Sequence, residues 1–315
     1  MKLIIQIPCL NEEKTLPQTL EQLPGEIPGI DKIEVLIIND GSNDGTVGVA
    51  KEIGVDHIVN FSSRQGLANA FRAGINKSLQ LGADIIVNTD ADNQYKGEDI
   101  VKLVRPILEG KADMVIGERD IESIKHFSFI KKKLQRLGSF IVRLVSNTDI
   151  RDATSGFRSY NREAAMRLNV MSDFSYTLET IIQASKKNIT VASVLIKTNP
   201  KLRESRLFSN MAEYLVASIL TLSKILIVYR PLAVFLWIGG FIGFWGAVLC
   251  VRFLYFYFAM GGLGHVQSLV LAAILLIISF QVVILGLLAS LIGANRFFIE
   301  DILYRVKKVE YSSKK

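Results

Sequence analysis

The chain has 315 residues and a formal net charge of +7, and half of its residues are hydrophobic. The 9% aromatic content and the low number of prolines, 7, exclude a disordered or low-complexity chain, and the mean hydropathy of +0.31 is high for a purely soluble protein. Two cysteines, Cys9 and Cys250, exclude a disulfide scaffold. The positive charge favours an anionic partner such as a nucleic acid, a nucleotide or a lipid headgroup.

Short β-rich runs alternate with helical patterns over the first 120 residues. The expected strands are Leu3–Ile7, Ile33–Asn39, His57–Phe61, Asp84–Asn88 and Asp113–Gly117. The expected helices cover residues 12–22, 44–53, 66–81 and 97–110. This alternation predicts right-handed β-α-β units, and therefore an α/β domain whose mainly parallel sheet has helices on both faces. Ligands of such folds bind beyond the carboxyl ends of the strands.

The sequence Asp90-Ala91-Asp92 follows the fourth expected strand and is the most informative motif. Two carboxylates separated by one residue point the same way in extended backbone, which suits Mg²⁺ or Mn²⁺ bound to a diphosphate. Gln94 adds a neutral oxygen. The chain has neither G-x-G-x-x-G after the first strand nor a P-loop, which argues against a dinucleotide-dependent dehydrogenase or a P-loop enzyme.

A second polar segment, Asn39–Thr46, follows the second expected strand. Its residue types are typical of a turn that leads into a helix N-cap. Asp40 in this segment is also a candidate hydrogen-bond acceptor for a nucleotide base or ribose.

Four motifs in order resemble family 2 glycosyltransferases of the GT-A fold, which is Rossmann-like. They are Pro8–Glu13, Asn39–Thr46, Asp90–Gln94 and Asp152–Arg158, and the resemblance covers about residues 1–230. The chain is most similar to the branch that acts on polyprenyl phosphates, which includes dolichol-phosphate mannose synthase and bacterial undecaprenyl-phosphate sugar transferases.

The resemblance implies roles for particular residues. Residues for the nucleotide sugar are Pro8, Asn11, Glu12, Asp40, Gly41, Ser42, Asp90 and Arg203. Ligands for the metal and diphosphate are Asp90, Asp92 and Gln94. Residues at the reacting groups are Asp92, Arg119, Asp152, Ser155 and Arg206. Among these, Arg119 would bind a phosphate, and Arg206 belongs to a basic loop. Ser155 would shape the acceptor pocket together with Gly156. Many relatives have glycine where this chain has Arg203, and the family's lysine after the third strand is missing from Gln65–Ala68.

The apolar excess of the chain lies near its C-terminal end. From Pro231 to Asn295 the only Asp, Glu, Lys or Arg is Arg252. Since a spanning helix needs about 20 residues, this stretch predicts two transmembrane helices, at about 232–258 and 267–293. Basic residues lie outside both spans and none lies between them, which predicts a hairpin with both ends in the cytoplasm. No signal peptide is expected at the N-terminus.

The expected organisation is a cytoplasmic GT-A domain at 1–208, a juxtamembrane helix at 209–230, the spans at 231–295 and a basic tail at 296–315. Within the first domain, residues of about 122–147 form a basic amphipathic pattern that predicts contact with anionic lipid. We therefore expect a multi-pass cell-membrane protein. A homo-oligomer is compatible with this organisation.

The leading interpretation is an inverting glycosyltransferase that moves one sugar from a nucleotide-diphosphate sugar to a polyprenyl phosphate. An ionised phosphate acceptor needs no general base, so we expect none to be essential. One alternative is a membrane-bound transferase of polysaccharide synthesis with a hydroxyl acceptor, although the chain has no Gln-x-x-Arg-Trp motif. A membrane-anchored nucleic-acid or nucleotide binder is a second alternative. It is disfavoured because the basic residues lie beside apolar helix faces rather than among exposed aromatics.

Overall fold

The computed structural model divides the chain into two compact units. One contains Met1–Val216 together with Glu300–Lys315, and the other contains Ala217–Ile299. The structure describes all residues except 120–142, 144–145, 147–149, 171–175, 201–219, 221–222, 225, 261–265 and 313–315. Of the expected amphipathic range 122–147 it therefore describes only Arg143 and Ser146.

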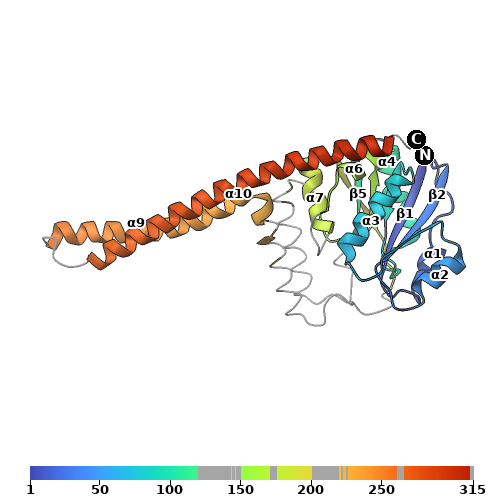
Figure 1. Ribbon diagram of the computed structural model, residues 1–315, viewed down its shortest axis with the longest axis horizontal. Coiled ribbons are helices and arrows are strands. Elements are labelled where there is room, and N and C mark those ends of the chain that lie inside the picture. Colours follow the sequence, from blue (N-terminus) through green and yellow to red (C-terminus); the bar gives the residue numbers. More distant parts are fainter. Residues whose placement is uncertain are drawn as a thin grey trace. The chain divides into compact units, whose positions relative to one another are not determined.

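The first unit is built on a seven-stranded sheet in the order β3-β2-β1-β4-β6-β5-β7. Figure 1 labels β1, β2 and β5 of this sheet. β1 pairs in parallel with β2 and β4, β2 with β3, and β5 with β7, whereas β6 runs antiparallel between β4 and β5. The sheet is therefore mainly parallel, as predicted. The strands are β1 Lys2–Cys9, β2 Lys32–Asn39, β3 His57–Asn60, β4 Ile85–Asn88, β5 Met114–Arg119, β6 Arg158–Asn161 and β7 Val191–Ile196.

Helices cover both faces of this sheet, which confirms the predicted fold class. Side chains of α1, α2 and α4 join the apolar cluster on one face, while α3, α6 and α7 pack together on the other. The helices are α1 Leu16–Glu21, α2 Thr46–Ile53, α3 Leu67–Gln80, α4 Ile100–Leu108, α6 Arg162–Arg167 and α7 Tyr176–Lys186, and a short 3₁₀ turn, η1 Gly97–Asp99, precedes α4.

All strands and helices expected over the first 120 residues are present, but the first helix is shorter than predicted. Most of the juxtamembrane helix expected at 209–230 lies outside the described residues. It begins at Leu16 rather than near residue 12. Asn11 has a left-handed φ of 56°, and the Glu12 carbonyl accepts the first turn's hydrogen bonds from Thr15 and Leu16. Pro17 then lies in the first helical turn, where its missing N–H costs nothing.

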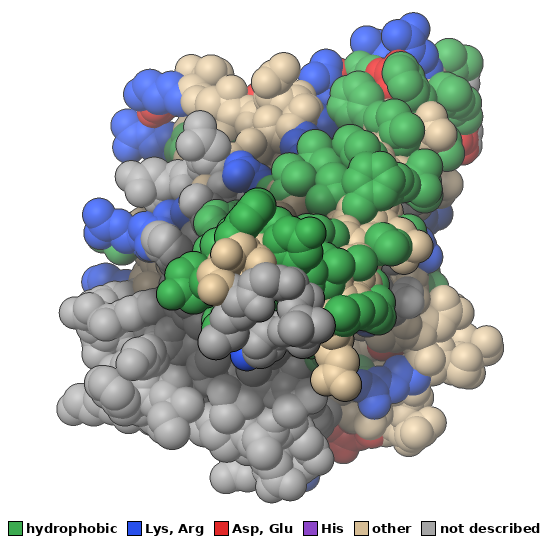
Figure 2. Space-filling view, turned by 90° about the vertical axis from the view of Figure 1, so that its left-hand side faces the viewer, with side chains coloured by type: hydrophobic (Ala, Val, Ile, Leu, Met, Phe, Trp, Pro, Cys, Tyr) green, Lys and Arg blue, Asp and Glu red, His purple; other side chains and the backbone are tan. Residues whose placement is uncertain are grey.

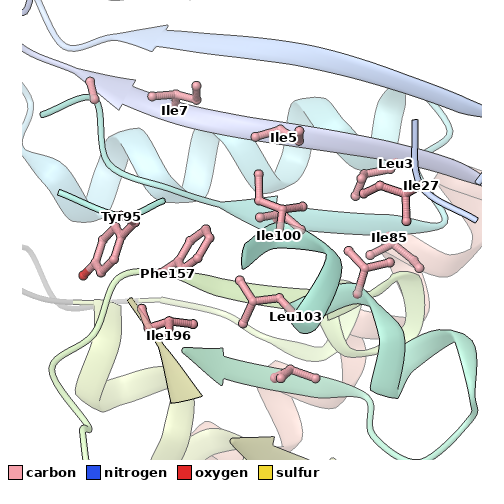
Figure 3. Close-up of a cluster of buried hydrophobic side chains, with 14 of the residues drawn as sticks. Leu3, Ile5, Ile7, Ile27, Ile85, Tyr95, Ile100, Leu103, Phe157 and Ile196 are labelled. Carbon is pink, nitrogen blue, oxygen red and sulfur yellow. The ribbon is translucent and has the colours of Figure 1, made fainter. Parts of the chain in front are cut away.

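The apolar core of the first unit lies between the sheet and the layer of α1, α2 and α4 (Figure 3). Alternate residues of β1, such as Leu3, Ile5 and Ile7, point into it, as the period of two in a strand requires. On its other face β1 contributes a polar side chain, Gln6, which is fully buried. One face of the sheet is therefore apolar, whereas the other carries buried polar groups close to the strand ends.

The second unit contains two long apolar helices, α9 Pro231–Met260 and part of α10 Val266–Ser312. By length and composition both are able to span a membrane, and the residues exposed along them are mostly hydrophobic (Figure 2). Small residues let the two helices pack closely: a Cβ on Gly239 would lie 2.9 Å from Val283, and Ser279 Oγ donates to the Gly239 carbonyl at 2.8 Å.

The helix α10 is longer than the span expected at 267–293. At 1.5 Å per residue its 47 residues extend about 70 Å, more than twice the hydrocarbon thickness of a bilayer. The chain contains no Gly or Pro after Gly293, so no helix breaker ends α10 where the apolar run stops. The residues expected as a tail therefore continue the helix as far as Ser312.

The last turns of α10 pack against α6 and α7 of the first unit. Glu300 forms a buried ion pair with Lys187 at 2.8 Å. The Tyr304 hydroxyl donates to Glu163 at 2.5 Å, and the Arg162 guanidinium donates to the Tyr311 carbonyl at 3.1 Å. This end of α10 is therefore an integral part of the first unit.

Candidate functional site

Four candidate segments follow strands that end at one edge of the sheet. Pro8 lies near the end of β1, Asp40 directly after β2, Asp90 two residues after β4 and Arg119 at the end of β5. The chain leaves β1 toward β2 and β3 and later returns to β4 on the opposite side of β1. The carboxyl ends of β1 and β4 thus form a topological switch point, where open α/β sheets bind their ligands.

The loops after β1 and β2 are joined to each other by hydrogen bonds. The backbone N–H of Asn11 donates to Ser42 Oγ at 2.9 Å, and the Asn11 side chain accepts from the backbone N–H of Asn43 at 2.8 Å. The backbone N–H of Glu12 donates to Thr46 Oγ1 at 2.8 Å. Asn11, Glu12 and Ser42, three of the residues expected to bind a nucleotide, therefore belong to one connected wall. Pro8 and Glu12 are buried.

Asp40 is buried and accepts backbone hydrogen bonds. Its carboxylate accepts from the N–H of Gln65 at 2.6 Å and of Gly66 at 2.9 Å, which fixes the entry into α3. The neighbouring Gly41 has φ +71°, and a Cβ there would lie 2.6 Å from the backbone of Ser63 and Arg64. This packing requires glycine at position 41, and the direct nucleotide contact expected of Asp40 stays a prediction.

The segment after β4 turns sharply instead of staying extended, contrary to the geometry expected for Asp90-Ala91-Asp92. A turn covers Ala91 and Asp92, and Asn93 has a left-handed φ of 56°. Asp92 Oδ1 accepts from the backbone N–H of Gln94 at 3.1 Å. Both aspartates and Gln94 are partly exposed at this edge of the sheet.

The chemistry of this segment fits a hard divalent cation. Mg²⁺ in proteins is usually held by one or two carboxylates, with the remaining positions taken by water and substrate phosphates. Among the described residues, no group of three or more Asp, Glu, His or Cys side chains converges on a metal position. Asp90 and Asp92 with Gln94 would thus supply few protein ligands and leave room for diphosphate oxygens.

Asp90 lies against Gly156 and two buried tyrosines. A Cβ on Gly156 would lie 3.2 Å from Asp90 Oδ1 and 2.8 Å from the Tyr176 hydroxyl, so the close approach depends on glycine. Burial, with the Asp90 charge nearby, raises the pKa of Tyr176 well above its usual value, and burial raises that of Tyr95 to about 12. Both phenols therefore stay neutral beside the carboxylate.

Hydrogen bonds between buried side-chain amides connect these groups to the sheet. Gln6 on β1 donates to Asn88 on β4 at 2.9 Å, and Asn88 Nδ2 donates to the Gly156 carbonyl and the Tyr176 hydroxyl, both at 2.9 Å. The Tyr176 ring in turn stacks on Phe71 of α3 with centroids 4.0 Å apart. The position of Gly156 next to Asp90 is thus set by β1, β4 and two helices together.

Arg119 and Asp152 form a buried, bidentate ion pair. Arg119 Nε donates to Asp152 Oδ2 at 2.7 Å and Nη2 to Oδ1 at 3.1 Å, while Thr154 Oγ1 accepts from the same Nη2 at 2.9 Å. Burial alone would raise the pKa of Asp152, but the Arg119 guanidinium and the bonds from Thr154 hold that pKa below its usual value. Asp152 is consequently ionised and engaged, a poor arrangement for a general base.

Ser155 is fully buried beneath this loop, so its hydroxyl is not exposed. Beside it lies Arg158, also fully buried, whose guanidinium donates to the carbonyls of Ala153, Ser155 and Thr177 at 2.7–2.8 Å. Sequence reasoning identified the Asp152–Arg158 motif but not the binding of Arg158 to backbone carbonyls. Ser155 therefore supports the loop from inside, and its expected contact with an acceptor stays a prediction.

Two expected site residues, Arg203 and Arg206, lie outside the described residues. Sequence reasoning also missed Asn88, Tyr95 and Tyr176, which all form hydrogen bonds with Gly156 beside Asp90. Aromatic and amide side chains are common in protein cores, so their presence in the sequence does not indicate a site. Their role becomes visible only where the fold brings them close to the segment after β4.

The chain is similar in sequence to known proteins. Residues 4–168, just over half of the chain, match the family described as Glycosyl transferase family 2. A UDP-N-acetylglucosamine–dolichyl-phosphate N-acetylglucosaminyltransferase of Methanococcus voltae is 30% identical over 217 residues, which cover 61% of this chain and 83% of that protein. An undecaprenyl-phosphate mannosyltransferase of Micrococcus luteus is 29% identical and covers 54% of this chain and 70% of its own length.

The fold also matches solved structures. Glucosyl-3-phosphoglycerate synthase of Mycobacterium tuberculosis, crystallised with Mn²⁺, UDP and phosphoglyceric acid, superposes with a TM-score of 0.54 at 19% identity. The match covers 70% of this chain and 78% of that one. At this identity the likeness concerns the fold.

Proposed function

Because the chain belongs to glycosyl transferase family 2, we propose that it transfers one sugar from a nucleotide-diphosphate sugar to a membrane polyprenyl phosphate, with inversion at the anomeric carbon. The named relatives that act on dolichyl and undecaprenyl phosphates support this acceptor class. The two long apolar helices support a lipid substrate, because they provide an anchor where such a lipid resides.

The observation that carries the proposal is the buried pair of Arg119 and Asp152. A hydroxyl acceptor has a high pKa, and its attack needs a positioned base. Asp152, the nearest candidate for that base, is held ionised by Arg119 and accepts hydrogen bonds on both oxygens. A phosphate monoester has a second pKa of about 6 and is already a nucleophile at neutral pH. The site therefore suits a phosphate acceptor.

In the proposed reaction an acceptor phosphate oxygen attacks the anomeric carbon while the bond to the nucleoside diphosphate breaks on the opposite side. Arg119 has one guanidinium nitrogen, Nη1, that takes part in none of its contacts with Asp152 and Thr154. We assign this nitrogen to the orientation of a substrate phosphate, with Asp152 fixing the plane of the guanidinium. The walls around Asn11 and Asp40 hold the nucleotide.

Asp90, Asp92 and Gln94 would hold a Mg²⁺ or Mn²⁺ ion. When bound, such an ion neutralises charge that develops on the diphosphate leaving group. The neighbouring residues fit this role: Gly156 packs closely beside Asp90 without a Cβ that would press on the carboxylate, and the nearby Tyr176 hydroxyl stays neutral and adds no charge.

We also propose that the chain is a multi-pass membrane protein with its catalytic unit in the cytoplasm. The sheet precedes α9 in the chain, and the end of α10 belongs to the same compact unit as the sheet. If α9 and α10 both cross the bilayer, their outer ends therefore lie on one side. Lys224, Arg230 and Arg296 flank the spans on that side, which favours the cytoplasm. The basic pattern at 122–147 favours contact with anionic lipid.

The test is transfer from a panel of UDP- and GDP-sugars, with a polyprenyl phosphate or with a neutral polyprenol as acceptor. We expect a glycosyl phospholipid only with the phosphate, together with stoichiometric release of nucleoside diphosphate and an inverted anomeric configuration. Transfer to the polyprenol or to a sugar hydroxyl at an equal rate would contradict the proposal and favour a polysaccharide-type reaction.

A further inference from the structure

The segment that carries Asp92 and Gln94 contains a residue whose backbone conformation needs support from other parts of the chain. Asn93, between them, is buried and has a left-handed φ of 56°. Asparagine tolerates this region better than other residues with a Cβ, but the conformation persists only where surrounding contacts enforce it. Within the segment, the hydrogen bond from the Gln94 N–H to Asp92 Oδ1 links the two proposed ligands to each other.

Asn199 supplies contacts to this segment from elsewhere in the chain. Its side-chain Nδ2 lies 3.1 Å from the Asn93 carbonyl and 3.2 Å from Asn93 Oδ1, and its backbone N–H donates to the Gln94 carbonyl at 2.9 Å. The same Nδ2 lies 2.9 Å from Oε1 of Gln22, the C-cap residue of α1. One amide side chain therefore joins the left-handed residue of the segment to a neighbouring helix.

Neighbouring residues align Asn199 with the segment. Thr198 forms an antiparallel bridge with Tyr95, and the backbone N–H of Lys197 donates to Asp99 Oδ2 at 2.7 Å. The stretch after β7 thus runs antiparallel beside the stretch after β4, although the two are about 100 residues apart in the sequence. This alignment positions the Asn199 side chain at Asn93, the residue of this segment whose backbone is in the left-handed region.

We infer that Asn199 is a positioning residue for the divalent cation, acting through Asn93 and Gln94 on the orientation of Asp92. It contacts neither of the proposed aspartate ligands through any hydrogen bond described above. This inference rests on the proposed function only for the presence of a cation at Asp90 and Asp92. Loss of the side chain leaves the backbone of Asn93 held by fewer bonds, so the ligands spend less time in the binding geometry. A hydrogen bond typically changes an equilibrium constant about fivefold. The two contacts from Asn199 Nδ2 to Asn93 share one amide group, so together they count for more than one bond and less than two, and we expect a loss of cation affinity of about tenfold.

The experiment compares Asn199→Ala with Asn161→Ala in the full-length protein. Asn161 is a matched control, because its amide also makes two side-chain bonds, to Asp113 and to the Ala164 N–H, but at the opposite end of the sheet. Mn²⁺ affinity is measured by electron paramagnetic resonance of the free ion, with Mn²⁺ alone and with Mn²⁺ plus UDP or GDP. Thermal unfolding of each variant is recorded in parallel without metal.

We expect Asn199→Ala to weaken Mn²⁺ binding about tenfold, with kcat at saturating Mn²⁺ within about twofold of the wild type. We expect Asn161→Ala to lower the melting temperature at least as much while leaving Mn²⁺ affinity unchanged. In a double-mutant cycle, Asn93→Gly should make the effect of Asn199→Ala smaller, since glycine adopts a left-handed φ without support.

Unchanged Mn²⁺ affinity in Asn199→Ala would overturn the inference, and so would an equal loss of affinity in Asn161→Ala, which would indicate a merely structural role. These readouts do not depend on the acceptor. Transfer to an acceptor other than a polyprenyl phosphate would contradict the proposed function alone, whereas a wild-type protein that binds no Mn²⁺ with either nucleotide would overturn the cation site on which this inference depends.

Discussion

Replacing Asp152 by asparagine separates the two chemical interpretations of the site. The substitution keeps the shape of the side chain but removes the charge that faces the Arg119 guanidinium, and it places an amide N–H₂ among the donors of Arg119 and Thr154. Removal of one partner from a buried ion pair typically costs 3–5 kcal/mol. Because the pair here is buried and bidentate, we expect the free energy of unfolding to fall by about 3 kcal/mol and the melting temperature by roughly 10 °C.

The pH dependence of the reaction gives the decisive readout. The folded pKa of Asp152 lies below its unfolded value, so the pair contributes stability that is present above about pH 4 and is lost as the pH falls further. If the acceptor phosphate is the nucleophile, kcat/KM should instead fall as the pH drops through about 6, the second pKa of a phosphate monoester. We expect this acidic limb in the wild type and in Asp152→Asn alike, with a lower plateau in the variant because Arg119 is less well oriented.

The assay follows labelled glycosyl lipid formation from pH 5 to 9, with polyprenyl phosphate as the varied substrate. Glu34→Gln is the control, because Glu34 is also a buried carboxylate with cationic partners but lies near the start of β2, away from the site. It should destabilise the protein without changing kcat. The base-free mechanism fails if Asp152→Asn abolishes turnover with nucleotide binding intact and also removes the acidic limb.

Further expectations concern the cation, the packing, the topology and acid stability. Asp92→Asn should lower turnover at least ~100-fold, and excess EDTA should stop the wild-type reaction; full activity in EDTA would contradict a metal role. Gly156→Ala, whose Cβ would press on the adjacent tyrosine hydroxyl and aspartate, should weaken Mn²⁺ binding in a titration, whereas Gly48→Ala, which has open space, should not. A cysteine at Gly262 should react with an impermeant label from outside intact cells; labelling only after permeabilisation would reject the hairpin. Burial raises the pKa of Glu34, but Lys2, Lys32 and His57 outweigh it and hold that pKa at about 2. Denaturant unfolding at pH 5 and pH 3 should therefore show a smaller acid loss of stability in Glu34→Gln than in the wild type.

The strand and helix pattern of the first 120 residues could be predicted because each element has a local signal. Buried parallel strands such as β1 are short apolar runs, and turn residues such as Asn39 to Gly45 separate them from amphipathic helices. The antiparallel insertion of β6 between β4 and β5 has no such signal. The β6 sequence Arg158–Asn161 is polar and only four residues long, and it becomes a strand through its two neighbours.

The candidate site was partly predictable for the same reason. Asp90 and Asp92 can be identified by their place after an apolar strand. The proposed orientation of Asp92, in contrast, depends on Asn93 and on Asn199, about 100 residues later in the chain. The role of Asp152 as a partner of Arg119 also depends on contacts between distant segments. Such contacts arise from the packing of the whole sheet, so they cannot be predicted from the spacing of residues along the chain.

The sharing of α10 between the two units has a consequence for the order in which the protein folds during synthesis. The last strand of the sheet ends at Ile196, but the helical turns that cover α6 and α7 begin at Glu300. At 5–20 residues per second the ribosome needs roughly 5–20 s to make the intervening chain, which contains both apolar helices. During this interval Lys187 lacks its carboxylate partner and the surface of α6 is uncovered. The catalytic unit therefore completes its folding only after both apolar helices have been made, and a chain arrested before Glu300 would expose an unfinished surface to chaperones and proteases.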